Sequence, residues 1–161
     1  MQRHILICRH AETEDPYPFQ PDFERELTQD GILQAHQTGH WIRDHFSKVD
    51  LILASPANRT RATTQILADK VYYAHEEIKY EPELYNGREP QLMQALSELP
   101  DKVKAVLLVA HNPGVTQLVR HLSGKRIPYL EPAEAVAVAV DLSSWTDIYI
   151  TEGEIVQRTT S

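Results

Sequence analysis

The residues best suited to chemistry are Arg9, His10, Arg59 and His111, which occur in three separate places. Arg9 and His10 directly follow the apolar run 5–8, Arg59 comes shortly after the run 51–54, and His111 directly follows the run 106–110. A phosphoryl group in transfer carries negative charge spread over its oxygens, so its catalysis depends mostly on positioned cations and hydrogen-bond donors. A neutral imidazole is also a competent nucleophile that titrates near physiological pH. These residue types therefore indicate phosphoryl transfer through a histidine.

Other chemistries fit the sequence less well. There is no Walker loop and no clustered aspartate pair to hold magnesium, so a covalent relay is the natural alternative. Cysteine phosphatases need an arginine six residues after the cysteine, and six residues after Cys8 is Glu14. His36 and His40 have a spacing that can bind metal, but the glutamate of the protease motif is absent and further ligands are needed. We therefore expect no metal site and no cofactor, and we place both histidines on a helix surface.

The elements that must position these residues follow an α/β pattern, because short apolar runs alternate with helical periodicity. The expected strands are residues 4–8, 51–54, 79–80, 106–110, 135–142 and an edge strand at 154–158. In open α/β sheets, ligands bind beyond the carboxyl ends of the strands. If the strands 4–8, 51–54 and 106–110 are parallel neighbours, then His10, the turn at Ser55 and His111 crowd one edge of the sheet.

Four helices are predicted. Thr28 is expected to cap the first one, in which apolar or small residues recur at steps of three and four, namely Ile32, Ala35, Gly39, Ile42 and Phe46. Ser55-Pro56 and Asn112-Pro113 each place a capping side chain before a proline suited to the first helical position. After the second pair, Val115, Leu118, Val119 and Leu122 form one apolar stripe, and another helix is expected over residues 90–99.

Arg59 is expected in the first turn of the helix that Ser55-Pro56 opens. The free N–H groups at such a helix end favour an anion, so Arg59 and the helix terminus would act together. Thr63, four residues further on, shares the Arg59 face, whereas Arg61 points about 200° away from it at about 100° per residue. Arg59, Ser55 and Thr63 are therefore candidates for substrate binding.

Length and composition indicate one globular domain over residues 1–161, with a core large enough to need no disulfide or metal. The single cysteine excludes a disulfide framework, and we expect neither a signal peptide nor a membrane span, which favours the cytoplasm. The net charge of −7 argues against binding to nucleic acid or anionic lipid. In so acidic a protein, a phosphate site would need a local cluster of positively charged side chains. We expect the protein to be a monomer.

Three segments together resemble the histidine phosphatase (phosphoglycerate mutase-like) superfamily. Residues 9–11 (Arg-His-Ala), residues 55–59 (Ser-Pro-Ala-Asn-Arg) with Thr63, and residues 109–114 (Val-Ala-His-Asn-Pro-Gly) look like its three elements, in the family's order and up to about residue 124. The resemblance implies a three-layer α/β/α sandwich with a mostly parallel central sheet. The short chain and the segment 22–28 before the first long helix look closest to the SixA-type phosphohistidine phosphatase branch.

The resemblance also implies roles for the candidate residues. His10 would be the nucleophile, and Arg9, Arg59 and His111 would form the phosphate pocket, with His111 donating a hydrogen bond to the transferring group. Two departures stand out: Ala11 replaces the commoner glycine, and Asn86 stands after Leu84-Tyr85 where phosphoester enzymes carry an acidic proton donor. Glu83 is close in sequence but in the wrong register.

The missing acid has a chemical interpretation. An alkoxide leaving group needs a proton, whereas an imidazole protonates easily near neutral pH. The chain also has little room for an inserted lid, so we expect an open site that accepts phosphohistidine on another protein, such as a phosphotransfer domain. The loop 15–21 follows His10 closely and should rim that site. Two alternatives stay open: a small-molecule phosphoester phosphatase that borrows Glu83 as its acid, and an inactive domain that only binds phosphorylated proteins.

Overall fold

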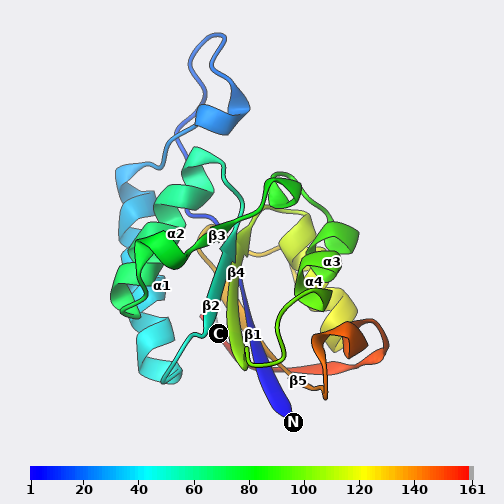
Figure 1. Ribbon diagram of the computed structural model, residues 1–161. Coiled ribbons are helices and arrows are strands. Elements are labelled where there is room, and N and C mark those ends of the chain that lie inside the picture. The colour runs from blue at the N-terminus through cyan, green and yellow to red at the C-terminus, as the bar shows by residue number, and fades with distance from the viewer. Residues whose placement is uncertain (160–161) are drawn as a thin grey trace.

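The computed structural model describes residues 1–159, and in this range six strands form one sheet in the order β3-β2-β4-β1-β5-β6 (Figure 1). The strands are β1 (Gln2–Arg9), β2 (Leu51–Ala54), β3 (Lys79–Tyr80), β4 (Ala105–Ala110), β5 (Ala135–Asp141) and β6 (Gly153–Arg158). The pairs β1–β4, β2–β4 and β2–β3 are parallel, whereas β5 runs antiparallel to both β1 and β6. All six predicted strands are confirmed, with bounds that shift by two residues at most, and the predicted edge strand is indeed last in the sheet.

The register of the three central strands brings their carboxyl ends to one edge. Arg9 lies opposite Ala110, and Ala54 lies opposite Val109. The backbone N–H of His10 donates to the carbonyl of Ala110 at 3.1 Å, and that of Ser55 donates to the carbonyl of Val109 at 3.1 Å. The predicted meeting of these strand ends is therefore confirmed.

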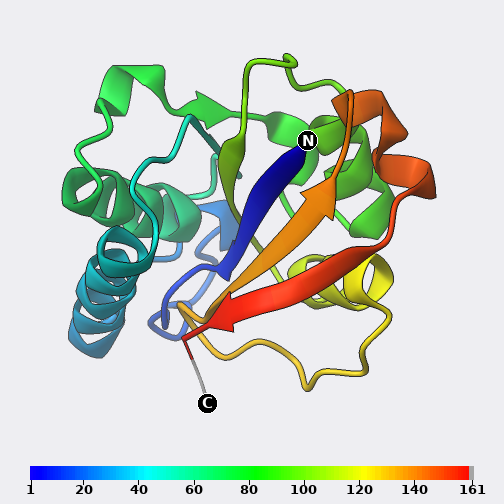
Figure 2. The same ribbon diagram turned by 90° about the horizontal axis from the view of Figure 1, so that it is seen from below.

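Helices cover both faces of the sheet, which confirms the three-layer arrangement (Figure 2). The helices α1 (Gln29–His45) and α2 (Asn58–Lys70) lie on one face, and α3 (Glu89–Ser97) and α4 (Gly114–Ser123) lie on the other. Four 3-10 helices complete the described elements: η1 (Asp22–Glu24), η2 (His75–Glu77), η3 (Pro82–Leu84) and η4 (Trp145–Ile150). Within residues 1–159, no helix combines the length and the apolar character that a bilayer crossing would require.

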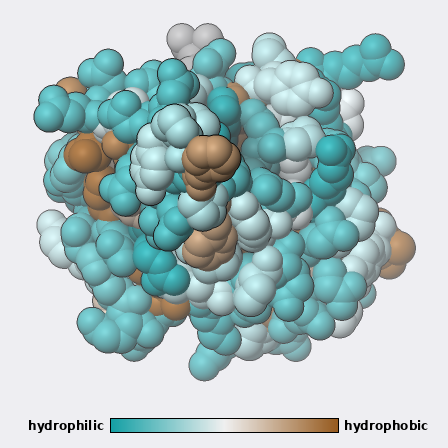
Figure 3. Space-filling model, turned by 90° about the horizontal axis from the view of Figure 1, so that it is seen from above, coloured by the Kyte–Doolittle hydropathy of each residue, from teal (hydrophilic) through white to brown (hydrophobic). Residues whose placement is uncertain are grey.

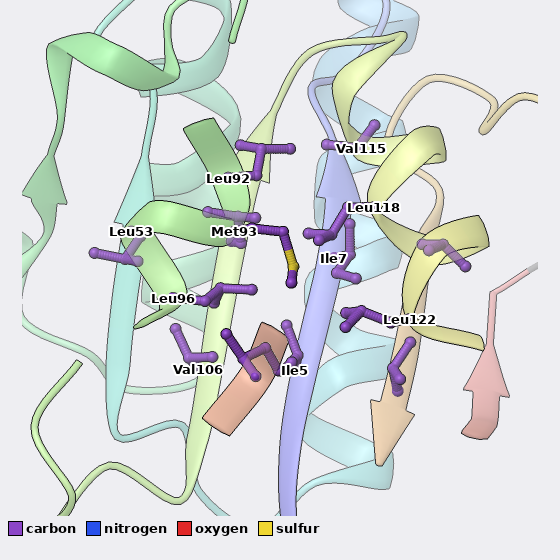
Figure 4. Packing of buried hydrophobic residues seen from close by; sticks show 14 of the residues in the cluster. Ile5, Ile7, Leu53, Leu92, Met93, Leu96, Val106, Val115, Leu118 and Leu122 are labelled. Carbon is purple, nitrogen blue, oxygen red and sulfur yellow. The ribbon is translucent and has the colours of Figure 1, made fainter. Parts of the chain in front are cut away.

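The sheet is buried on both faces, which explains why its strands are continuously apolar. Ile5 and Ile7 point into the larger core cluster with side chains of α3 and α4, such as Met93 and Leu118 (Figure 4). Leu6 and Cys8 point to the opposite face and pack with α1 and α2. Full burial of such a side chain stabilises the fold by about 1.5–3 kcal/mol, so this two-sided core fixes the strand ends that carry the polar residues.

The first helix begins as predicted, and Ala35, Gly39 and Ile42 of its predicted stripe are buried. Thr28 is its N-cap and accepts the Gly31 N–H at 2.8 Å. The prediction for Ile32 is wrong, because its side chain is 41% exposed while the neighbouring Gly31 is buried. A side chain at Gly31 would meet the carbonyl oxygen of Glu12 at 2.2 Å, so the chain segment after His10 crosses the helix at this point.

Candidate active site

His10 stands at the carboxyl end of β1 with its ring held in one orientation. The side chain is 9% exposed, and Nδ1 lies 2.8 Å from the carbonyl oxygen of Ala11. Because a carbonyl oxygen only accepts, the proton of the neutral ring is on Nδ1 in this hydrogen bond, which leaves the lone pair on Nε2. The geometry therefore presents His10 as a neutral imidazole with Nε2 available as a nucleophile.

His111 follows β4 and lies beside His10. The two ring centroids are 5.2 Å apart at an interplanar angle of 61°. Nε2 of His111 is 2.8 Å from Ser55 Oγ, which already accepts the Ala57 N–H at 3.3 Å. The Ser55 hydroxyl can donate its hydrogen to Nε2, and in that arrangement the ring proton of His111 is on Nδ1. That buried Nδ1 has no hydrogen-bond partner among the described residues.

Both imidazoles are held in the neutral state. Burial, followed by the charges of Arg59, Arg9 and Arg25, lowers the pKa of His10 to about 4, although its hydrogen bond to Ala11 acts in the opposite direction. Burial and then the neighbouring His10 and Arg59 lower the pKa of His111 to about 3. At neutral pH His10 is therefore unprotonated at Nε2, which a nucleophile requires.

Arg59 is the second residue of α2, as the sequence predicted for the first helical turn. Its side chain is buried, with Nη1 donating to the carbonyl oxygen of Asp22 at 2.7 Å and Nη2 donating to Asp22 Oδ2 at 2.9 Å. The same carboxylate accepts the hydroxyl of Tyr85 at 2.7 Å. Partial burial acts to raise the pKa of Asp22, but the hydrogen bonds from Tyr85 and Arg59 lower it to about 2.

Two further arginines leave donors unused near His10. Arg9 Nη1 donates to the carbonyl oxygen of Leu130 at 3.1 Å, and Arg25 Nη2 donates to Thr13 Oγ1 at 2.8 Å. The Nε atoms of Arg9 and Arg25 are buried and have no partner within residues 1–159. Buried donors without partners are costly, so such a group signals a site that an acceptor can complete. Nδ1 of His111 is a third such atom, and the charges of Arg9 and Arg59 act on both imidazoles, so the surroundings of His10 are suited to an oxyanion.

Ser55 and Thr63 support the site from behind. Both side chains are fully buried. Thr63 Oγ1 donates to the carbonyl oxygen of Arg59 at 2.8 Å and accepts the Ala11 N–H at 3.0 Å, so it ties α2 to the residue after His10. The structure thus brings together Arg9, His10, Ser55, Arg59, Thr63 and His111, with Ser55 and Thr63 bonded to protein groups.

The two predicted helix caps are wrong. Ala57, not Ser55, is the N-cap of α2, and it makes no side-chain capping bond. Ser55 Oγ instead serves the Ala57 N–H and His111, so a tertiary hydrogen bond replaces the local one. Pro113 is the N-cap of α4, and Asn112 bonds the Thr116 hydroxyl and the Leu130 carbonyl rather than a helix end. The apolar stripe predicted for α4 is confirmed, because its four members are buried.

The sequence analysis assigned no role to three residues of the site, Asp22, Arg25 and Tyr85, although Asp22 and Arg25 lie in the segment 22–28 that supports the family resemblance. Only their place in the sequence could have indicated a role, because loops that follow strand ends often form binding sites. Glu83, the alternative acid, is exposed and lines a different hollow with Lys79 and Gln94.

Comparisons with known proteins identify the family of the chain and similar folds. The model of the histidine phosphatase superfamily (branch 1) matches residues 5–89. A phosphohistidine phosphatase SixA homolog of Haemophilus influenzae is 34% identical over 137 residues, which cover 78% of this chain and 80% of that relative. The structure of a putative phosphohistidine phosphatase SixA from Nakamurella multipartitia has a TM-score of 0.81 at 22% identity, covering 99% of this chain and 96% of that one. The protein histidine phosphatase SixA in complex with tungstate has a TM-score of 0.81 at 22% identity, covering 96% and 95% of the two chains. In this chain a neutral histidine at the end of β1 lies near arginines and a second histidine. The chain belongs to the histidine phosphatase superfamily.

Proposed function

We propose that this protein is a phosphohistidine phosphatase that hydrolyses phosphohistidine on another protein. In the first step, the lone pair on Nε2 of His10 attacks phosphorus, and the P–N bond to the substrate imidazole breaks. The leaving imidazole takes a proton from solvent. In the second step, water attacks phospho-His10, which yields inorganic phosphate and restores the neutral ring. The proposed reaction requires neither a metal nor a cofactor.

The donors around His10 supply the charge stabilisation that this reaction needs. Arg9, Arg59 and Nδ1 of His111 would bind the oxygens of the transferring phosphoryl group, where negative charge is spread in the transition state. Ser55 would hold His111 in the tautomer that donates from Nδ1, and Thr63 would fix Arg59 relative to Ala11. In this proposal Ser55 and Thr63 are positioning residues.

The observation that carries the choice of substrate is the state of the carboxylate in the site. Asp22 has a pKa of about 2, so it is ionised at neutral pH and cannot give a proton to a leaving group. Glu83 lies in another hollow. An imidazole leaving group protonates without such an acid, whereas an alkoxide does not. The name of the relative from Haemophilus influenzae, a phosphohistidine phosphatase homolog, supports the same substrate class.

We further propose that the partner is a phosphotransfer domain in the cytoplasm, and that the protein acts on it as a monomer. The two alternatives make different demands. A phosphoester phosphatase needs a protonated acid beside the leaving group, and an inactive binding domain needs no nucleophile.

The test is to trap the intermediate. After brief exposure to a labelled phosphodonor such as phosphoramidate, the protein should carry an acid-labile, alkali-stable label that His10→Ala abolishes and His40→Ala, on the exposed face of α1, retains. With chelator present, phosphohistidine should be hydrolysed much faster than alkyl phosphates. A label absent from His10 would support the binding domain, and equal rates on both substrates would support the phosphoester enzyme.

A further inference from the structure

A loop rises from the sheet edge directly after the site and stands clear of the rest of the molecule (Figure 1). We call residues 14–24 the arm. Its base is closed by the bridge between Thr13 and Leu27 and by the Glu14 N–H, which donates to the carbonyl oxygen of Glu26 at 2.8 Å. The arm therefore begins four residues after His10 and returns to the body just before α1.

The tip of the arm carries aromatic side chains that contact solvent. Phe19 is fully exposed and Tyr17 is 62% exposed. The Gln20 N–H donates to the Tyr17 carbonyl at 2.9 Å, with Pro18 at the second position and a φ of 63° at Phe19. This is the pattern of a type II turn, whose third position favours glycine. Phe19 thus occupies a strained backbone position, and it buries no surface within the described chain in return.

Tyr72 is the useful comparison for Phe19, because it also combines an exposed aromatic side chain with a positive φ. Tyr72 is also an exposed aromatic residue, at 85%, with a φ of 59°. However, it follows the C-cap of α2, where a left-handed residue is a common way to end a helix. Phe19 ends no helix. The turn accounts for the left-handed backbone at Phe19 but not for a bulky residue at its third position, and such a residue points to a functional constraint.

The arm is ordered by its own hydrogen bonds and prolines. Gln20 Oε1 accepts the Tyr17 N–H at 3.2 Å, and Gln20 Nε2 donates to the Glu24 carbonyl at 3.2 Å. Pro16, Pro18 and Pro21 restrict the backbone further. A contact surface that is already ordered loses less entropy on binding.

The arm is also joined to the catalytic groups. Asp22, on its returning side, binds Arg59 Nη2 at 2.9 Å. The Phe23 ring packs against Tyr85 at a centroid distance of 5.1 Å, and Tyr85 packs against His111 at 5.7 Å. The face seen from above is mostly hydrophilic, with hydrophobic side chains near its centre and others toward its margins (Figure 3). Through these contacts with Arg59 and, by way of Tyr85, with His111, the arm borders the site that contains His10.

We infer that the arm is a docking element for the phosphohistidine-bearing protein, with Phe19 and Tyr17 as its apolar anchors. This inference rests on the proposed function. The arm exposes the carboxylates of Glu14, Asp15 and Glu24, so the complementary surface is an apolar patch next to the phosphohistidine, flanked by lysine or arginine. Exposed aromatic residues on a rigid loop are typical anchors of protein interfaces.

The test compares Phe19→Gly with Tyr72→Gly. Glycine relieves the backbone strain at both positions, so neither variant should lose folding stability, and only Phe19→Gly removes an anchor. The substrates are a four-helix histidine phosphotransfer domain phosphorylated with phosphoramidate, and free phosphohistidine. For Phe19→Gly we expect kcat/KM on the domain to fall about tenfold, mainly through KM, as for loss of an interface aromatic residue. Turnover of free phosphohistidine should be unchanged, and Tyr72→Gly should match the wild type on both substrates.

A second variant tests the charges. The double variant Glu14→Gln, Asp15→Asn should lower kcat/KM on the domain at low salt, and this difference should vanish at high salt. Equal kcat/KM of wild type and Phe19→Gly on the domain would overturn the inference, as would a wild type that hydrolyses the domain no faster than free phosphohistidine. If the wild type hydrolyses neither substrate and His10 takes no label, the proposed function itself is wrong.

Discussion

The carboxylate of Asp22 accepts a hydrogen bond from Arg59 Nη2 at 2.9 Å. The guanidinium that would bind phosphate is therefore already paired with a carboxylate of the protein. The Asp22 carbonyl accepts Nη1 of the same guanidinium at 2.7 Å. Asp22 therefore has two opposing effects on a phosphoryl group. It holds Arg59 in a fixed orientation, and its negative charge repels the incoming oxygens.

Asp22→Asn separates these two effects. The amide oxygen can still accept from Arg59, while the charge is removed. Because the Asp22 side chain is half exposed, we expect a modest gain: vanadate should bind up to about fivefold more tightly, in line with one solvent-screened charge interaction. The measurement is the inhibition constant of vanadate. Weaker binding of vanadate by Asp22→Asn would mean that orientation of Arg59 by the carboxylate outweighs the repulsion.

Ser55→Ala tests the control of the His111 tautomer. Without the hydroxyl at 2.8 Å, Nε2 loses its partner and the ring proton is no longer directed to Nδ1. We expect kcat on phosphohistidine to fall about tenfold, with the fold intact by circular dichroism. This is less than the loss of about 10²–10³-fold for removal of an oxyanion donor itself, because Ser55 acts only through His111. Ser123→Ala is the matched control, since it removes a 2.7 Å hydroxyl–carbonyl bond at the far end of α4. Equal kcat for the two variants would exclude this role for Ser55.

The strands were predictable because their signal is local. Continuous apolar runs such as residues 5–8 and 106–110 are buried on both faces, and the polar residue that ends each run marks the sheet edge. The prediction that His10 and His111 meet also required these strands to be parallel neighbours, and the structure shows that they are. The family resemblance identified the same residues independently.

The parts that could not be predicted depend on tertiary contacts. Ser55-Pro56 has the local pattern of a helix start, but the Ser55 hydroxyl is used by His111, 56 residues away in sequence. Asp22 and Tyr85 are 63 residues apart, at the ends of the short 3-10 helices η1 and η3, and only packing brings them to Arg59. No periodicity or motif spacing encodes such a contact.

Gly114→Ala should destabilise the turn that carries His111. A Cβ at this position would lie 2.2 Å from the carbonyl oxygen of Gly87, so the backbone of one segment must move. We expect a loss of about 1–3 kcal/mol in the free energy of unfolding, as for overpacking of a buried contact. Activity should fall as well, because Gly114 lies three residues after His111. Gly124→Ala is the control, since nothing lies within 4 Å of its Cβ and only its φ of 70° opposes the change. Urea unfolding of both variants measures the difference.

Stability should fall as the pH is lowered from 6.5 to 4.5, in part because of the two buried histidines. Their pKa values of about 4 for His10 and about 3 for His111 lie below the ordinary 6.5. In this pH window both imidazoles are protonated in the unfolded chain but not in the native state. Each of them therefore contributes a slope approaching about 1.4 kcal/mol per pH unit to the free energy of unfolding. This contribution is complete above pH 6.5 and is lost as the pH falls toward the native pKa values. His111→Asn should remove the part of this slope that His111 contributes. Urea unfolding at several pH values tests this, and a slope for His111→Asn as steep as that of the wild type would show that His111 is not held neutral.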